Sequence, residues 1–275
     1  MADEFKRSVA QVLGSEGGYS NRSKKDDPGG ATNMGVTQAV YDVYRRSLGA
    51  KPQSVKFIVR AEAESIYRGR YWALVKADQL PAGVSYVVFD GAVNSGPAQS
   101  AKWLQRALGV PDDGLVGPAT IAAAKAHTNH DALVADMIRQ RLAFMKTLSN
   151  WEANKNGWIS RLKHVLDVGQ AWASGDVGPA PVYHENGDAK APVSAVKAAP
   201  SSAPGEAATA VGGASAVLAQ TTQQLAPFSS IELVGKIIAC LTVAGALVAI
   251  GGIAYSIYAK RKAKAVDVAV NGAAT

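Results

Sequence analysis

Two carboxylates stand on either side of a glycine-containing segment near the start of this 275-residue chain. Glu16 is followed directly by Gly17-Gly18-Tyr19, and Asp27 is followed by Pro28-Gly29-Gly30-Ala31-Thr32-Asn33. A glycosidase needs one carboxylic acid that protonates the leaving oxygen, and usually a second acidic group or a positioned water. The pair is therefore suited to the hydrolysis of a sugar linkage.

The two carboxylates are expected in contrasting environments. Glu16 follows an amphipathic helical segment whose apolar face consists of Phe5, Val9, Val12 and Leu13. A helix C-terminus disfavours negative charge and partial burial adds a desolvation cost, so both effects favour the protonated form that a general acid needs. Asp27 lies on a hydrated turn and should stay ionised. The alternative is that Glu16 is a surface residue and Asp27 only forms a turn before proline.

Helical periodicity dominates residues 1 to about 175, which hold all five tryptophans. We expect a mainly α fold with further helices at Val36–Tyr44, Val55–Val75, Val84–Val93, Leu133–Leu148 and Trp158–Trp172, and helices that begin at Pro97 and Pro118. The segment Ser20–Asn33 is the exception, because its Asp-Pro and Gly-Gly pairs predict a turn or a small β-hairpin beside Glu16.

The composition changes after residue 175. Residues 176–230 are rich in Ala, Pro, Ser and Gly, which predicts a flexible linker. Ile237–Ala259 then form 23 residues without a charge, bracketed by Lys236 and by Lys260-Arg261-Lys262. A helix of this length spans the roughly 30 Å hydrocarbon core of a bilayer. We therefore expect one transmembrane helix within 231–259 and a short basic tail at 260–275.

The orientation of this helix rests on two conflicting cues. The basic cluster after it favours a cytoplasmic tail, with the large N-terminal part outside. The N-terminus, however, has no apolar region of a secretory signal, so the export route stays open. We expect a single-pass protein of the bacterial inner membrane that acts in the periplasm. Gly245, Gly251 and Gly252 would permit helix pairing, with a second copy or with a holin.

The net charge of +7 favours a polyanionic partner, such as nucleic acid, a membrane surface or a bacterial cell wall. The basic stretches lack the aromatic interleaving of single-strand binders, so we expect no nucleic acid partner. His127 and His130 have no HExxH motif or cysteine pair beside them, which argues against a metal site, and no cofactor fingerprint is present. Cys240 is the only cysteine and leaves no intrachain disulfide.

Longer motifs resemble a known family. Glu16–Tyr19 together with Asp27–Gln38 resembles the N-terminal signature of the EGGY-type muramidases, glycoside hydrolase family 108, which includes phage endolysins and proteins described as secretion activators. Ile66-Tyr67, Tyr71-Trp72 and the run Phe89–Pro97 resemble the same architecture. The runs Ala101–Gly109 and Asp113–Pro118 resemble the predicted peptidoglycan-binding domain that follows in that family. The resemblance covers about residues 5–172.

The resemblance implies a lysozyme-like helical fold, with a catalytic part at 1–80 and a peptidoglycan-binding part at 81–175. It implies cleavage of the β-1,4 bond from N-acetylmuramic acid to N-acetylglucosamine, with Glu16 as the essential acid. Asp27 matches the motif of the second acid better than its neighbour Asp26 does. The other candidates are Thr32 and Thr37 to position a water, and Tyr19, Asn33 and Asn94 to line the sugar cleft.

Several alternatives stay open. Thr32 and Thr37 fit ordinary turn or helix-cap roles equally well, and Tyr19 fits core packing. A phage endolysin for host lysis is the expected function, whereas a lytic transglycosylase would use the same acid on the same bond, and a non-catalytic anchor would only bind the wall. A host secretion factor would share the chemistry. Inversion or retention depends on the carboxylate separation.

Overall fold

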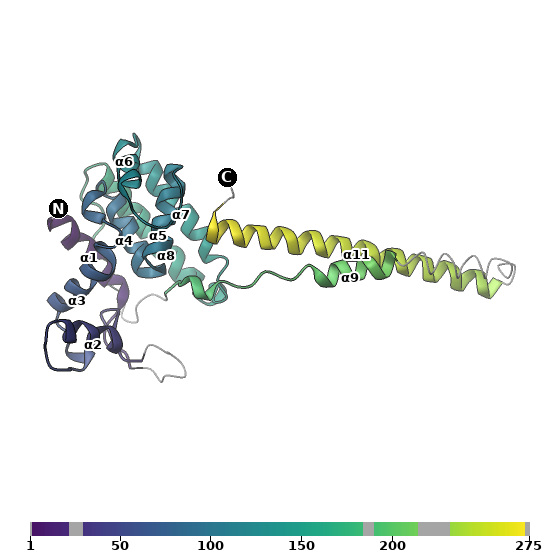
Figure 1. Ribbon diagram of the computed structural model, residues 1–275, viewed down its shortest axis with the longest axis horizontal. Coiled ribbons are helices and arrows are strands. Elements are labelled where there is room, and N and C mark those ends of the chain that lie inside the picture. Colours follow the sequence, from purple (N-terminus) through teal and green to yellow (C-terminus); the bar gives the residue numbers. More distant parts are fainter. Residues whose placement is uncertain (1, 22–29, 184–189, 214–231, 273–275) are drawn as a thin grey trace. The chain divides into compact units, whose positions relative to one another are not determined.

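The computed structural model describes residues 2–21, 30–183, 190–213 and 232–272. It forms two compact units, residues 1–196 and 197–275. The first unit is a cluster of helices around a central one, and the described part of the second unit contains helices α9 (Ala203–Gly213) and α11 (Glu232–Asn271) (Figure 1). The first unit is not divided at residue 80, and it extends to residue 196, past the start of the linker predicted at 176–230.

The N-terminal part supplies one long helix and a very small sheet. Helix α1 spans Ala2–Glu16, so that Glu16 is its last residue rather than the residue that follows the helical segment. Strands β1 (Thr32–Asn33) and β2 (Val36–Thr37) form an antiparallel hairpin, and Ser20 pairs with Thr32. Strand β1 is the end of the segment Ser20–Asn33 where a turn or small hairpin is expected, whereas β2 lies three residues beyond it, at the start of the expected helix Val36–Tyr44. Residues 22–29, and with them Asp26 and Asp27, lie outside the described residues.

The segment from Val36 to Val75 is more divided than its periodicity suggests. It holds α2 (Gln38–Ser47), η1 (Val55–Phe57), α3 (Arg60–Tyr67), the π-helical η2 (Arg68–Trp72) and, just after it, η3 (Ala77–Gln79). The expected helix at Val55–Val75 is broken because Ile58 and Val59 are extended. The Glu62 carboxylate accepts a hydrogen bond from the Val59 amide at 3.2 Å, which fixes the start of α3 instead.

Helix α4 (Val84–Ser95) is the centre of the first unit, as its apolar sequence predicts. Every one of its residues is buried. It packs against α1, against α5 (Pro97–Leu108), and against α7 (His130–Met145) and α8 (Trp151–Ala173) (Figure 1). A helix surrounded on all sides can be apolar all round, which explains why it shows no polar face.

The surrounding helices begin where their sequences favour a start. Pro97 opens α5 and Pro118 opens α6 (Pro118–Ala126), as expected from the preference of proline for the first turn. The Asn129 side chain caps α7 by accepting a hydrogen bond from the Ala132 amide at 2.9 Å. The α5 helix ends at Gly109 with φ +67°.

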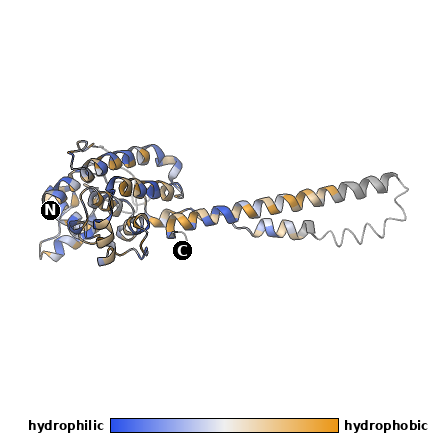
Figure 2. Ribbon diagram, turned by 90° about the horizontal axis from the view of Figure 1, so that it is seen from above, coloured by the Kyte–Doolittle hydropathy of each residue, from blue (hydrophilic) through white to orange (hydrophobic). Residues whose placement is uncertain are grey.

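The second unit pairs α9 (Ala203–Gly213) with the long helix α11 (Glu232–Asn271). Gly205 and Gly252 allow the closest approach, since a Cβ on Gly252 would lie 2.6 Å from the Gly205 carbonyl oxygen. Lys260 forms an ion pair with Glu206 at 3.0 Å. Figure 2 shows a long apolar stretch along α11 that gives way to a hydrophilic one.

The expected transmembrane segment 237–259 is helical within α11. The side chains of 237–242 and of 245 fall outside the described residues. In the part of the chain that the structure describes, none of the helices is long and apolar enough to cross a lipid bilayer.

The core of the first unit rests on aromatic side chains that meet edge to face. Phe89 of α4 contacts Trp72 at 5.3 Å, Phe5 at 6.2 Å and Tyr67 at 6.4 Å between ring centroids. Phe89 is fully buried, whereas Phe57 of η1 is 62% exposed. The aromatic cluster therefore joins α1, α3 and η2 to the central helix.

We predict that Phe89→Ala lowers the free energy of unfolding by about 3–5 kcal/mol, because it leaves a cavity among three aromatic rings. Phe57→Ala makes the same chemical change at an exposed position and should alter it by less than about 0.5 kcal/mol. Urea unfolding of both full-length variants measures the difference. Equal effects of the two substitutions would contradict this description of the core.

Candidate active site

Glu16 lies at the C-terminal end of α1, where the chain turns sharply. Gly17 has φ +73°, a conformation that glycine adopts without steric cost, and this residue ends the helix. The Glu16 side chain is only 2% exposed. A carboxyl group is almost never buried to this degree unless charged or polar groups surround it, so its neighbours define the site.

The turn of the β-hairpin lies directly against this carboxyl group. Met34 and Gly35, between β1 and β2, have φ values of +49° and +70°, as in the type I′ turns that favour glycine. A Cβ on Gly35 would lie 2.5 Å from Glu16 Oε2 and closer still to the Tyr67 hydroxyl oxygen. Both the backbone conformation and the space therefore require glycine at position 35.

Tyr67 of α3 joins the hairpin to the core. Its hydroxyl donates a hydrogen bond to the Met34 carbonyl at 3.0 Å, and its ring is buried. Burial, followed by the negative charge of Glu16, raises the pKa of Tyr67 well above its ordinary value. The phenol therefore stays protonated and keeps donating to the turn that covers Glu16.

Arg161 of α8 lies between two buried carboxylates. Its Nη1 is 3.5 Å from Glu16 Oε1, and its Nη2 donates to Asp90 Oδ1 at 2.8 Å. Arg141 of α7 donates through Nη2 to the other oxygen of Asp90, also at 2.8 Å. All four side chains are at most 2% exposed. Helices α1, α4, α7 and α8 thus meet in one buried charge network.

The charge state of Asp90 shows how strongly the two arginines act. Burial alone would raise the pKa of Asp90, but the positive charges of Arg161 and Arg141 and their hydrogen bonds lower it to about 2. Asp90 therefore remains ionised at physiological pH. Removal of one partner from such a network typically costs about 3–5 kcal/mol, because an uncompensated charge is left in the interior.

A second cation reaches Glu16 from another part of the chain. Lys190 Nζ donates to Glu16 Oε2 at 2.5 Å. The lysine side chain is 38% exposed and the Glu16 side chain 2%, so the ammonium group lies on the side of the carboxylate that leads to solvent. Glu16 thus has Arg161 on its interior side and Lys190 on its outer side.

The threonines named from the sequence lie in the hairpin, and their contacts are local. The Thr32 hydroxyl donates to the Gly30 carbonyl at 3.2 Å. The Thr37 hydroxyl accepts from the Val40 amide at 3.4 Å as the N-cap of α2. These are the turn and helix-cap contacts that stood as the alternative to a catalytic role.

The three residues named for the sugar cleft lie in different environments. Tyr19 is 43% exposed, and the Lys56 ammonium lies 5.7 Å from its ring centre, so it is not a core residue. Asn33 is buried and donates to the Val55 and Lys56 carbonyls at 3.3 and 3.0 Å, which fixes η1 to the hairpin. Asn94 is buried near the end of α4, and its backbone carbonyl accepts a hydrogen bond from the Ala191 amide at 3.1 Å.

Sequence reasoning missed the residues that surround Glu16. Asp90 carried a usable signal, because it is the one charged residue in a largely apolar helix, and such a residue must be paired when the helix is buried. Arg141 and Arg161 carried none, since arginines on amphipathic helices are ordinarily at the surface. Lys190 lies within the stretch 176–230 of linker composition, which gives no reason to expect a contact with Glu16.

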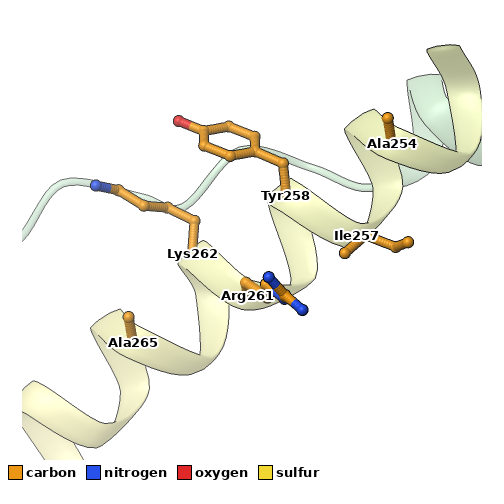
Figure 3. Close-up of a pocket in the computed structure, with 6 residues that line it drawn as sticks. All are labelled: Ala254, Ile257, Tyr258, Arg261, Lys262 and Ala265. Atoms are coloured by element: carbon orange, nitrogen blue, oxygen red, sulfur yellow. The ribbon is translucent and has the colours of Figure 1, made fainter.

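Two other features do not have the chemistry of an active site. A surface hollow of about 430 Å³ on α11 is lined by Ala254, Ile257, Tyr258, Arg261, Lys262 and Ala265, without a carboxyl group (Figure 3). Among the described residues, no group of three or more His, Cys, Asp or Glu side chains could hold a metal ion. His127 and His130 instead make local hydrogen bonds, to the Asn129 amide and the Ala124 carbonyl.

Comparison with known proteins divides the first unit into two consecutive segments. Residues 9–96 match the family described as glycosyl hydrolase 108, and residues 99–163 match the predicted peptidoglycan domain. A solved structure, titled "Structure of Brucella abortus SagA", is similar at 36% sequence identity and a TM-score of 0.54. The similarity covers 63% of this chain and 97% of that one. No curated protein matches.

The charge network crosses the border between these two segments. Glu16 and Asp90 belong to the first, whereas Arg141 and Arg161 belong to the second. The second segment therefore supplies interior side chains to the site, in addition to any contact it makes at the surface.

We predict that Gly35→Ala disrupts the site, because the new methyl group meets Glu16 and Tyr67. Gly49 offers a matched control: it has φ +65° and no heavy atom within 4 Å of an added Cβ. Gly49→Ala should cost only the strain of the backbone conformation, about 1 kcal/mol. Gly35→Ala should cost at least about 2 kcal/mol more, as overpacked substitutions do. Urea unfolding measures the free energy of unfolding of both variants. Equal losses of this free energy would show that the hairpin turn is not in close contact with Glu16.

Proposed function

We propose that this chain, which belongs to the glycosyl hydrolase 108 family, is an N-acetylmuramidase with Glu16 as its general acid. The family and the predicted peptidoglycan domain make it a glycoside hydrolase that acts on peptidoglycan. The observation that carries the proposal is the buried carboxyl group of Glu16 at the end of α1, enclosed by the hairpin turn and by Arg161. The proposed bond is the β-1,4 linkage from N-acetylmuramic acid to N-acetylglucosamine.

In the proposed reaction, Glu16 donates a proton to the glycosidic oxygen while positive charge develops on the sugar ring. The bond to the leaving sugar breaks, and the ring takes up an oxygen from water, whose proton restores the acid. Asp27 is proposed to stabilise the positive charge or to activate that water. Its support is its position directly before Pro28-Gly29-Gly30.

Tyr19 is proposed to contact the glycan strand. Its exposed ring offers an apolar face beside the hairpin, which suits the face of a sugar. The Asn33 side chain donates to the Val55 and Lys56 carbonyls, which favours a structural role over direct sugar binding. Asn94 is proposed to face the glycan through its side chain, whose Oδ1 accepts from the Ser95 hydroxyl at 3.4 Å.

We predict that Glu16→Gln reduces the release of muropeptides from purified peptidoglycan by about 10²–10⁴-fold, the usual contribution of a general acid. Glu152→Gln makes the same chemical change on a side chain that is 78% exposed and should leave the rate unchanged. Asp27→Asn should weaken activity strongly. Mass spectrometry of the products of the full-length proteins measures all three rates.

The products also separate the competing functions. Reducing-end N-acetylmuramic acid supports a muramidase, whereas 1,6-anhydro products would identify a lytic transglycosylase. A protein that pellets with peptidoglycan but releases nothing would be a wall-binding anchor. Wild-type activity in Glu16→Gln would rule out the proposed acid.

We also propose that the segment 237–259 anchors the protein in the inner membrane of a bacterial host, with the enzyme acting in the periplasm during phage-induced lysis. The support is its 23 uncharged residues and the basic cluster that follows. Apolar side chains of this part of α11 are exposed, including Leu247 and Ile250 at 64% and 63%. A second copy or a holin is the proposed partner of the helix within the bilayer.

We predict that the full chain stays with the membrane fraction after carbonate extraction, and that two charges placed in the span, Leu247→Arg with Ile250→Arg, release it. The matched control, Lys262→Arg with Lys264→Arg, lies beyond the span and should remain bound. Extraction of the unaltered protein by carbonate would contradict the anchor.

A further inference from the structure

Two stretches that follow α8 contact α1 and the candidate active site. We call residues 177–183 and 190–196 the strap. Both parts belong to the first unit, and both lie beyond the two segments that match known families, which end at residue 163. The strap is thus an addition to the glycoside hydrolase and peptidoglycan segments.

The first part of the strap is fixed by its backbone. The Val177 carbonyl accepts from Trp172 Nε1 at 2.7 Å, and the Pro179 carbonyl accepts from the Gln11 side chain at 2.8 Å. The strap also passes so close to α1 that a Cβ on Gly14 would lie 2.6 Å from the Val182 carbonyl oxygen. It therefore follows α1 towards the helix end that carries Glu16.

The second part of the strap contacts the candidate active site. Lys190 forms its ion pair with Glu16, and the next residue, Ala191, is fully buried and donates its amide to the Asn94 carbonyl at 3.1 Å. Further on, the Ser149 amide donates to the Ala195 carbonyl at 2.9 Å, and Val196 pairs with Leu148. The chain is thus held on both sides of Lys190.

The position of Lys190 conflicts with catalysis. A general acid must come within about 2.6–3.2 Å of the oxygen that it protonates. The ammonium group already lies at 2.5 Å from Oε2, on the side of Glu16 that leads to solvent. The glycosidic oxygen and the Lys190 ammonium cannot occupy this position together.

We propose that the strap is an autoinhibitory element, in which Lys190 occupies the place of the glycosidic oxygen against Glu16 and must leave before the glycan strand can bind productively. The inference rests on the proposed function, because it takes Glu16 as the acid. Substrate and strap then compete for one site, so the apparent affinity for glycan is the intrinsic affinity multiplied by the fraction of molecules whose strap is displaced.

The test compares full-length wild type with Lys190→Ala, Lys190→Arg and the control Lys197→Ala, which removes the same charge at the start of the second unit. One readout is the affinity for soluble tetra-N-acetylglucosamine by calorimetry. The other is the initial rate of muropeptide release at low substrate. Lys190→Ala should raise both by about three- to tenfold, since a charge-assisted hydrogen bond to a part-exposed lysine is lost. Lys190→Arg and Lys197→Ala should behave like wild type.

The two readouts separate the strap from the proposed function. Higher affinity in Lys190→Ala without release of products by any variant would support the autoinhibitory role of the strap and rule out the muramidase activity. Unchanged or lower affinity in Lys190→Ala would overturn the strap, whether or not the protein is active. A lower melting temperature of Lys190→Ala with unchanged affinity would assign the strap a structural role only, which also overturns the proposal.

Discussion

An ionised aspartate in the centre of the first unit constrains everything around it. Asp90 stands on α4, a helix with no exposed residue, where an unpaired carboxylate would be very costly. Arg141 and Arg161 must therefore reach it from α7 and α8, and this fixes how these helices pack. Because Arg161 also contacts Glu16, the same requirement that holds the core together positions the proposed acid. The core and the candidate active site thus share the same buried ion pairs.

This charge network shows that the two family segments share one interior. The segment described as a predicted peptidoglycan domain contributes Arg141 and Arg161 to the interior of the glycosyl hydrolase 108 segment. Two side chains at most 2% exposed in a shared network make the segments parts of one folding unit, in agreement with the absence of a division at residue 80. Glycan binding and catalysis would then be coupled through helix packing, with no linker between them.

Sequence patterns predicted the helix positions and helix ends that depend on neighbouring residues. The apolar sequence at Val84–Val93 predicted the central helix, prolines predicted the starts of α5 and α6, and Gly17 marks the end of α1 beside Glu16. Contacts between distant residues escaped prediction, because neither Arg161 nor Lys190 differs in sequence from a solvated cation. The break at Ile58 and Val59 also escaped, since it depends on the Glu62 carboxylate and on the Gln38 side chain, which accepts from the Val55 amide.

The central claim is that Arg161 positions Glu16 for proton donation. Arg161→Lys keeps the charge but loses the planar fork that reaches Glu16 and Asp90 together. Its direct measurement is kcat and KM for muropeptide release by full-length Arg161→Lys, with Arg139→Lys on the surface as the control. We expect kcat to fall by about tenfold or more, with KM little changed and both values unaffected in the control. An unchanged kcat in a folded Arg161→Lys protein would contradict the account.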